Sequence, residues 1–80
     1  MKREDLIGLM GAYGMELQFE RPEEHKMRFK GNGTFLDVWT GKRGMTVGRY
    51  VPSVSGMTFH KRMDAEKLEG VLVEITKQDN

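Results

Sequence analysis

The feature that most restricts the fold of this chain is the segment Gly31-Asn32-Gly33, which separates two stretches of alternating polar and apolar residues. An Asn-Gly pair in this setting predicts a two-residue β-hairpin turn, because both central residues of a type I′ turn need a positive φ. Such a turn pairs Gly31 with Thr34. It also predicts the further cross-strand pairs Lys30–Phe35, Phe29–Leu36, Arg28–Asp37, Met27–Val38 and Lys26–Trp39. A slip of one residue would mix apolar and charged side chains on both faces, so the pattern supports the same register.

A second tight turn is predicted at Lys42-Arg43, between Gly41 and Gly44. Closing this hairpin predicts the pairs Val38–Val47, Phe35–Tyr50, Asp37–Gly48 and Trp39–Thr46. Strand patterns also cover residues 15–20, where Met15, Leu17 and Phe19 alternate with polar residues, and residues 57–61. Residues 21–24 and 51–56 read as loops, because they contain Pro22, Pro52 and Gly56.

Helical spacing of apolar residues appears at both ends of the chain. Residues 3–13 carry one apolar stripe, and Gly14 is a plausible C-terminal stop for that helix. Asp64 is a good N-cap for the second helix, and Met63 and Leu68 have the spacing of a hydrophobic staple. The buried stripe of this helix is predicted to be Leu68, Val71, Leu72 and Ile75, and residues 76–80 are predicted to be a frayed tail.

The order of elements predicts one α+β domain over residues 1–80. We expect an antiparallel meander of four or five strands, with the N-terminal and C-terminal helices packed on one face. That inner face should carry Met27, Phe29, Leu36, Val38, Met45 and Val47. The outer face should carry Lys26, Arg28, Lys30, Phe35, Asp37, Trp39, Thr46 and Tyr50, with Gly48 leaving a gap between the rings.

Charge and composition bear on function mainly by exclusion. The chain has no cysteine, which excludes disulfides, thiolate zinc sites and a cysteine nucleophile, and which favours a reducing, cytoplasmic location. No apolar run approaches the length of a membrane span, and no secretion signal is expected at Met1-Lys2-Arg3. The formal net charge is only +1, but residues 26–62 hold eight Lys and Arg against the single acid Asp37. No cofactor is expected.

Three aromatic side chains among cations on an open sheet favour a non-enzymatic binding module that contacts nucleic acid. Bases would stack on Phe35, Trp39 and Tyr50. Phosphates would meet the cations Lys26, Arg28, Lys30, Lys42, Arg43 and Arg49, with Lys61 and Arg62 extending the track. Two alternatives stay open: the rings only stabilise the sheet, or the chain binds and inhibits or adapts a host protein, as small phage or mobile-element proteins do. Pairing of sheet edges would make a homodimer.

Two layouts resemble known families. Residues 34–75, three strands followed by a helix, are similar in layout to the sheet-reading DNA-binding domains of some phage integrases. The segment His25-Lys26-Met27-Arg28-Phe29 loosely resembles the bacterial messenger-RNA-cleaving toxins of the HicA type, which implies a ribonuclease using His25 as the enzymatic alternative. The Gly-Ser/Thr-His signature of that family is missing here. Neither His25 nor His60 stands in a metal-ligand spacing, so no metal site is predicted.

Overall fold

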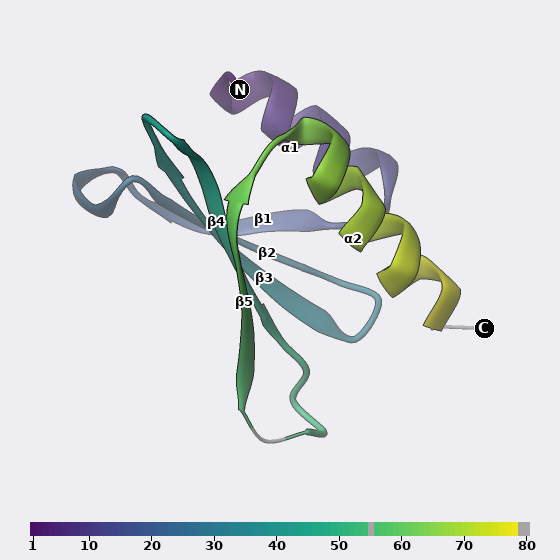
Figure 1. Ribbon diagram of the computed structural model, residues 1–80. Helices are drawn as coiled ribbons and strands as arrows, with labels where there is room; N and C mark the ends of the chain where they lie inside the picture. Colours follow the sequence, from purple (N-terminus) through teal and green to yellow (C-terminus); the bar gives the residue numbers. More distant parts are fainter. Residues whose placement is uncertain (55, 79–80) are drawn as a thin grey trace.

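The computed structural model describes residues 1–54 and 56–78 of the chain. Its elements follow the predicted order of helix, five strands and helix (Figure 1). Their bounds are α1 Arg3–Ala12, β1 Glu16–Arg21, the 3-10 turn Pro22–Glu24, β2 Lys26–Gly31, β3 Thr34–Gly41, β4 Gly44–Tyr50, β5 Met57–Met63 and α2 Ala65–Gln78. The predicted tail at residues 76–80 therefore continues α2 as far as Gln78, and residues 79–80 lie outside the described part.

The five strands form one antiparallel meander in the order β1-β2-β3-β4-β5. Asn32 and Gly33 have φ values of 51° and 69°, as a type I′ turn requires. Every cross-strand pair predicted for the two central hairpins is confirmed, including Phe29–Leu36, Arg28–Asp37 and Asp37–Gly48. Turn chemistry and side-chain pattern agree in these hairpins, and the register follows from both.

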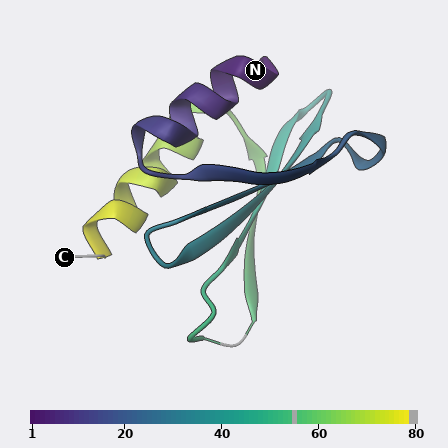
Figure 2. The ribbon, with the colours of Figure 1, turned by 180° about the vertical axis from the view of Figure 1, so that it is seen from behind.

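Both helices pack on the same face of the sheet, as predicted, and none of the described helices lies on the opposite face (Figures 1 and 2). The core between the two layers contains Leu6 and Met10 of α1, the inner residues of the strands, and Leu68, Val71, Leu72 and Ile75 of α2. Five of the seven methionines are buried, so most of them fill the core. Tyr13 Oη also donates a hydrogen bond to Glu69 Oε2 at 2.9 Å, which ties the end of α1 to α2.

Local signals account for the helix ends. Asp64 Oδ1 accepts a hydrogen bond from the backbone N–H of Lys67 at 2.8 Å, so the predicted N-cap is confirmed. Gly14 follows α1 with a φ of 76°, a left-handed conformation that favours glycine. Its carbonyl oxygen would lie only 2.1 Å from a Cβ at Gly31, so the turn after α1 can approach the β2–β3 hairpin because residue 31 is glycine.

Both edge strands contain a β-bulge. In β1, Gln18 is an extra residue between the pairs Leu17–Phe29 and Phe19–Arg28. The uninterrupted alternation predicted for residues 15–20 is therefore wrong, because the bulge rotates Phe19 onto the outer face. In β5, Lys61 and Arg62 together face the single residue Thr46, and Arg62 has a φ of 56°. Bulges distort the free edges and make them poor templates for another strand.

None of the described helices is long and apolar enough to cross a membrane.

Candidate functional site

The outer sheet face, opposite the helices, is the surface that combines aromatic and basic side chains. Strand registers place on it the basic residues Arg21, Lys26, Arg28, Lys30 and Lys61, the acids Glu16 and Asp37, and the apolar residues Phe19, Phe35, Trp39, Tyr50, Met57 and Phe59. The predicted outer set is therefore brought together, and side chains from β1 and β5 are added to it.

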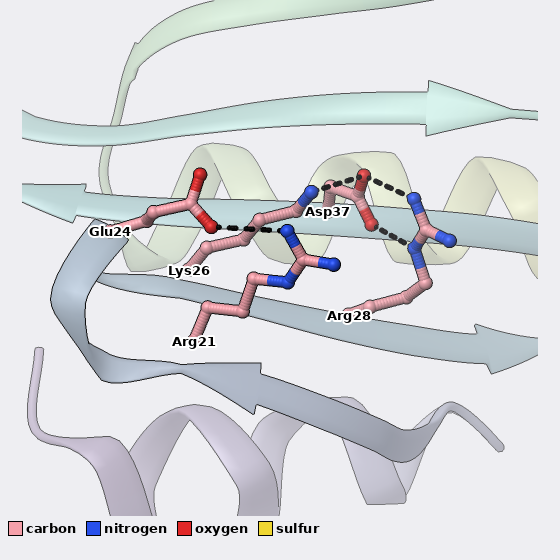
Figure 3. A network of polar contacts seen from close by, with 5 residues as sticks. All are labelled: Arg21, Glu24, Lys26, Arg28 and Asp37. Carbon is pink, nitrogen blue, oxygen red and sulfur yellow. Dashed lines mark hydrogen bonds and ion pairs between the residues drawn. The ribbon is translucent and has the colours of Figure 1, made fainter.

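A buried carboxylate lies at the centre of this face. The Asp37 side chain is only 2% exposed and pairs with Arg28 through two hydrogen bonds, Nε to Oδ1 at 2.6 Å and Nη2 to Oδ2 at 2.9 Å. Lys26 Nζ lies 3.6 Å from the same Oδ2 atom, so both cations converge on one acid (Figure 3). A separate, exposed ion pair between Arg21 and Glu24 lies beside them. Paired charges of this kind are what makes burial of a carboxylate tolerable.

The protonation of this cluster follows from its surroundings. Burial alone would raise the pKa of Asp37, but the hydrogen bonds and charge of Arg28, with the charge of Lys26, hold that pKa below its ordinary value. The hydrogen bond to Asp37 raises the pKa of Arg28. At neutral pH the cluster therefore consists of one carboxylate and two cations.

The same cations cover aromatic rings. Lys26 Nζ lies 5.1 Å from the ring centroid of Trp39, and Lys30 Nζ lies 5.4 Å from that of Phe35. The guanidinium carbon of Arg28 lies 5.1 Å from the centroid of Phe19. Each contact is within the distance at which a cation is attracted to a ring face. The β1–β3 half of the outer face is thus a network in which two cations pair with one acid and three cations contact three aromatic rings.

The β4–β5 half of the face is different, because its rings pack against rings of β3. Phe35 and Tyr50 form one tilted pair at 6.0 Å between centroids, and Trp39 and Phe59 form another at 6.2 Å. A Cβ at Gly48 would lie 3.3 Å from Trp39 Cζ3 and 3.2 Å from Phe59 Cε1. The gap predicted at Gly48 is therefore wrong: both rings lean over the glycine and bury it.

This second half is also the more exposed. Phe59 is 53% exposed and Tyr50 is 38% exposed. Beside Tyr50 lies an open depression of about 420 Å³, lined by Arg28, Phe35, Tyr50, Gly56 and Met57. Exposed rings around a shallow depression can take a flat apolar group from solution.

The structure divides the remaining predicted cations. Lys42 and Arg43 are exposed at the β3–β4 turn, beyond the Trp39 end of the face. Arg49 pairs with Leu36 and Thr58 on the side that the helices cover, and it lines a depression shared with His60 and Glu74. The prediction that Arg49 belongs to the same phosphate track as Lys30 is therefore wrong, because alternation in β4 turns it to the opposite face.

Sequence reasoning missed two rings of the face. Phe19 was hidden by the bulge at Gln18, for which the sequence has no clear marker. Phe59 lies opposite Gly48, but the loop at residues 51–56 lacks a short turn motif that would set the β4–β5 register. The signal that does exist is compositional: a glycine in mid-strand is often covered by an aromatic residue of the neighbouring strand.

His25 and His60 lie apart from the aromatic face. His25 is exposed, ends the 3-10 turn with a φ of 54°, and its carbonyl oxygen accepts the N–H of Thr40 at 2.9 Å. His60 pairs with Val47, on the side facing the helices. Within residues 1–54 and 56–78, no three His, Cys, Asp or Glu side chains come together as a metal-binding group.

Comparison of the chain with protein-family models, with curated proteins and with solved structures found no match. The case for a function therefore depends on the geometry and chemistry of the outer face.

Proposed function

We propose that the outer face of the sheet binds single-stranded nucleic acid and that the chain is a non-enzymatic binding module. The observation that carries this proposal is the pair of exposed rings, Phe59 and Tyr50, on a sheet face that also carries basic residues and that none of the described helices covers. Bases stack on such rings with about 1–3 kcal/mol each, and the stacking tolerates any base.

Charge supports a polyanionic ligand. The outer face carries five basic residues against Glu16 and Asp37, and the exposed turn Lys42-Arg43 adds two more at one end. The acids of the helical layer, Glu66, Glu69 and Glu74 among them, lie on the other side of the molecule. A ligand with negative charge is therefore attracted to the sheet side and repelled from the helix side.

The β-bulges in both edge strands favour ligand binding on the outer face over strand pairing at the sheet edges. A partner strand that extended the sheet would need a regular edge, and the bulges at Gln18 and at Lys61-Arg62 interrupt both of them. This argues against edge pairing as the mode of binding or of homodimer formation.

A second candidate is a protein partner, which includes the inhibitor or adaptor of a host protein. It is favoured by the apolar character of the β4–β5 half, where Tyr50 and Met57 line the open depression and the exposed ring of Phe59 follows in β5. Tyr and Arg are also common anchors of protein interfaces. Such a partner would bind with weak salt dependence and fixed stoichiometry, whereas phosphate contacts make binding strongly salt-dependent.

The test is a fluorescence-anisotropy titration of labelled single-stranded RNA, single-stranded DNA and duplex DNA at two salt concentrations. Tyr50→Ala and Lys30→Ala should both weaken single-strand binding, and Lys30→Ala should also flatten its salt dependence. Lys67→Ala removes the same charge from the exposed side of α2 and is the matched control, expected to bind as the unmodified chain does. Absence of binding at tens of micromolar would reject nucleic acid and leave the protein partner.

The ribonuclease alternative has its own measurement. We expect the labelled RNA to remain intact during prolonged incubation, because His25 is exposed and stands outside the aromatic face. Cleavage that is lost in His25→Ala would overturn the non-enzymatic proposal.

A further inference from the structure

We propose that Asp37 is an internal competitor for phosphate that makes the outer face selective for single-stranded over duplex nucleic acid. The inference rests on the proposed function and concerns which cations of the face are available to a ligand.

The contacts divide the cations of β2 into two classes. Arg28 and Lys26 converge on Asp37, and the Lys26 side chain is only 15% exposed. Lys30 lies on the same face of the same strand, but it is exposed and contacts the ring of Phe35. Asp37 therefore orients Arg28 and Lys26 and offsets one of their two positive charges, while Lys30 can turn toward a phosphate.

A phosphate could take over the two hydrogen bonds that Arg28 makes with Asp37 only by replacing a buried, bidentate carboxylate. That exchange would leave the Asp37 side chain, 2% exposed, without its main partner. The ligand thus gains little by binding there. Phosphate contacts are left to the rim, at Lys30, Lys61 and the turn Lys42-Arg43.

This division favours single strands for a chemical reason. Duplex binding without base contacts depends almost wholly on the number of phosphates neutralised. A single strand can instead offer unstacked bases to Tyr50 and Phe59 and needs only a few rim cations. Asp37 holds Arg28 and Lys26 away from phosphates. It therefore lowers the affinity for duplex, which depends on phosphate contacts, more than the affinity for a single strand, which also gains from base stacking.

The experiment measures the slope of log affinity against log salt for a labelled single-stranded oligothymidylate and a matched duplex. Lys30→Gln should reduce the single-strand slope by about 0.7, the value for one phosphate, and Arg28→Gln should reduce it by much less. Asp37→Asn should steepen it by roughly 1 to 1.5, because two cations are released, and should tighten duplex binding by about tenfold. Adding Arg28→Gln to Asp37→Asn should reverse about half of that steepening.

The matched control is Glu16→Gln, which removes one negative charge from the same face, at the position paired with Lys30. If it steepens the slope as much as Asp37→Asn does, net charge explains the effect and the inference is overturned. Equal losses of slope in Arg28→Gln and Lys30→Gln would also overturn the inference. Both of these variants keep Asp37, so they test the inference even if Asp37→Asn does not fold. In both cases the unmodified chain still binds and the proposed function stands. Absence of binding by the unmodified chain would reject both.

Discussion

The two faces of the sheet use the same strands for different purposes. On the inner face, Phe29, Leu36, Val38 and Val47 are fully buried under the helices. On the outer face, alternate residues of the same strands leave Tyr50 and Phe59 partly in solvent and hold a buried carboxylate between two cations. The inner face supplies the hydrophobic core under the helices. The outer face pairs rings with charges.

On the outer face the most buried side chain is charged and belongs to a polar cluster, whereas burial on the inner face is hydrophobic. Asp37 is as buried as the core residues, yet it has no helix above it, because its cover consists of neighbouring side chains. Replacing a paired buried charge with a well-packed apolar residue is often neutral or stabilising.

Substitution of one phenylalanine on each face should lower the free energy of unfolding by very different amounts. Phe29→Ala should lower the free energy of unfolding by about 3–5 kcal/mol, because it opens a cavity in the core. For a domain of this size, that loss is a large part of the total. Phe59→Ala, at a half-exposed ring, should cost less than about 1 kcal/mol. Urea unfolding followed by circular dichroism measures both, and similar losses would mean that the outer rings belong to the core.

Asp37→Asn should lower the free energy of unfolding by about 1–3 kcal/mol at pH 7, because the paired cations lose a buried partner. The pKa of Asp37 is lower in the folded state than its ordinary value of about 3.9, so its contribution is present above that pH. The contribution is lost as pH falls through the folded-state pKa.

The difference in stability between the unmodified chain and Asp37→Asn should therefore shrink below about pH 4, which urea titrations at several pH values can follow. Glu16→Gln, an exposed acid on the same face, provides the matched comparison. A difference that stayed constant down to low pH would show that the charge of Asp37 does not stabilise the fold.

Removal of an exposed ring should affect binding more than folding. Phe59→Ala should weaken single-strand binding by about 1–3 kcal/mol, or roughly five- to 150-fold, because one stacking platform is lost. Val54→Ala changes another exposed apolar residue, in the loop after β4, and should bind normally. Anisotropy titration compares them, and an equal loss in both variants would contradict stacking on Phe59.

The smallest effect is expected at Gly48, where an added Cβ would lie 3.1 Å from Met57 Sδ and close to both rings of the Trp39–Phe59 pair. Gly48→Ala should therefore displace these side chains by a few tenths of an ångström and change stability by less than about 1 kcal/mol. The emission of Trp39, the single tryptophan, should shift to longer wavelength as the ring meets more water.

Gly70→Ala is the control for Gly48→Ala, because no atom lies within 4 Å of a Cβ at Gly70 in α2. It should stabilise the helix by about 0.5–1 kcal/mol and leave the emission unchanged. An unchanged spectrum in Gly48→Ala would mean that Trp39 does not rest on the glycine.

The sequence alone determined the centre of the fold. The Asn32-Gly33 turn and the alternation around it specified the β2–β3 register, including the Arg28–Asp37 pair, because turn geometry and hydrophobic pattern act over a few residues. The same holds for the β3–β4 hairpin and for the Asp64 cap of α2. The inner position of Arg49 also follows from the sequence, since Arg49 lies two residues from Val47 and therefore on the same face of β4, as Leu36 and Val38 do in β3.

The positions of the other side chains on the outer face depend on tertiary packing. The bulge that turns Phe19 outward depends on how β1 fits beside β2 and under α1, and the position of Phe59 depends on how a six-residue loop returns the chain. The convergence of Lys26 on Asp37, and the collapse of Trp39 and Phe59 over Gly48, involve side chains from several strands. Local pattern carries the pairing of neighbouring strands, whereas the packing of rings and charges across a sheet depends on all strands being in place.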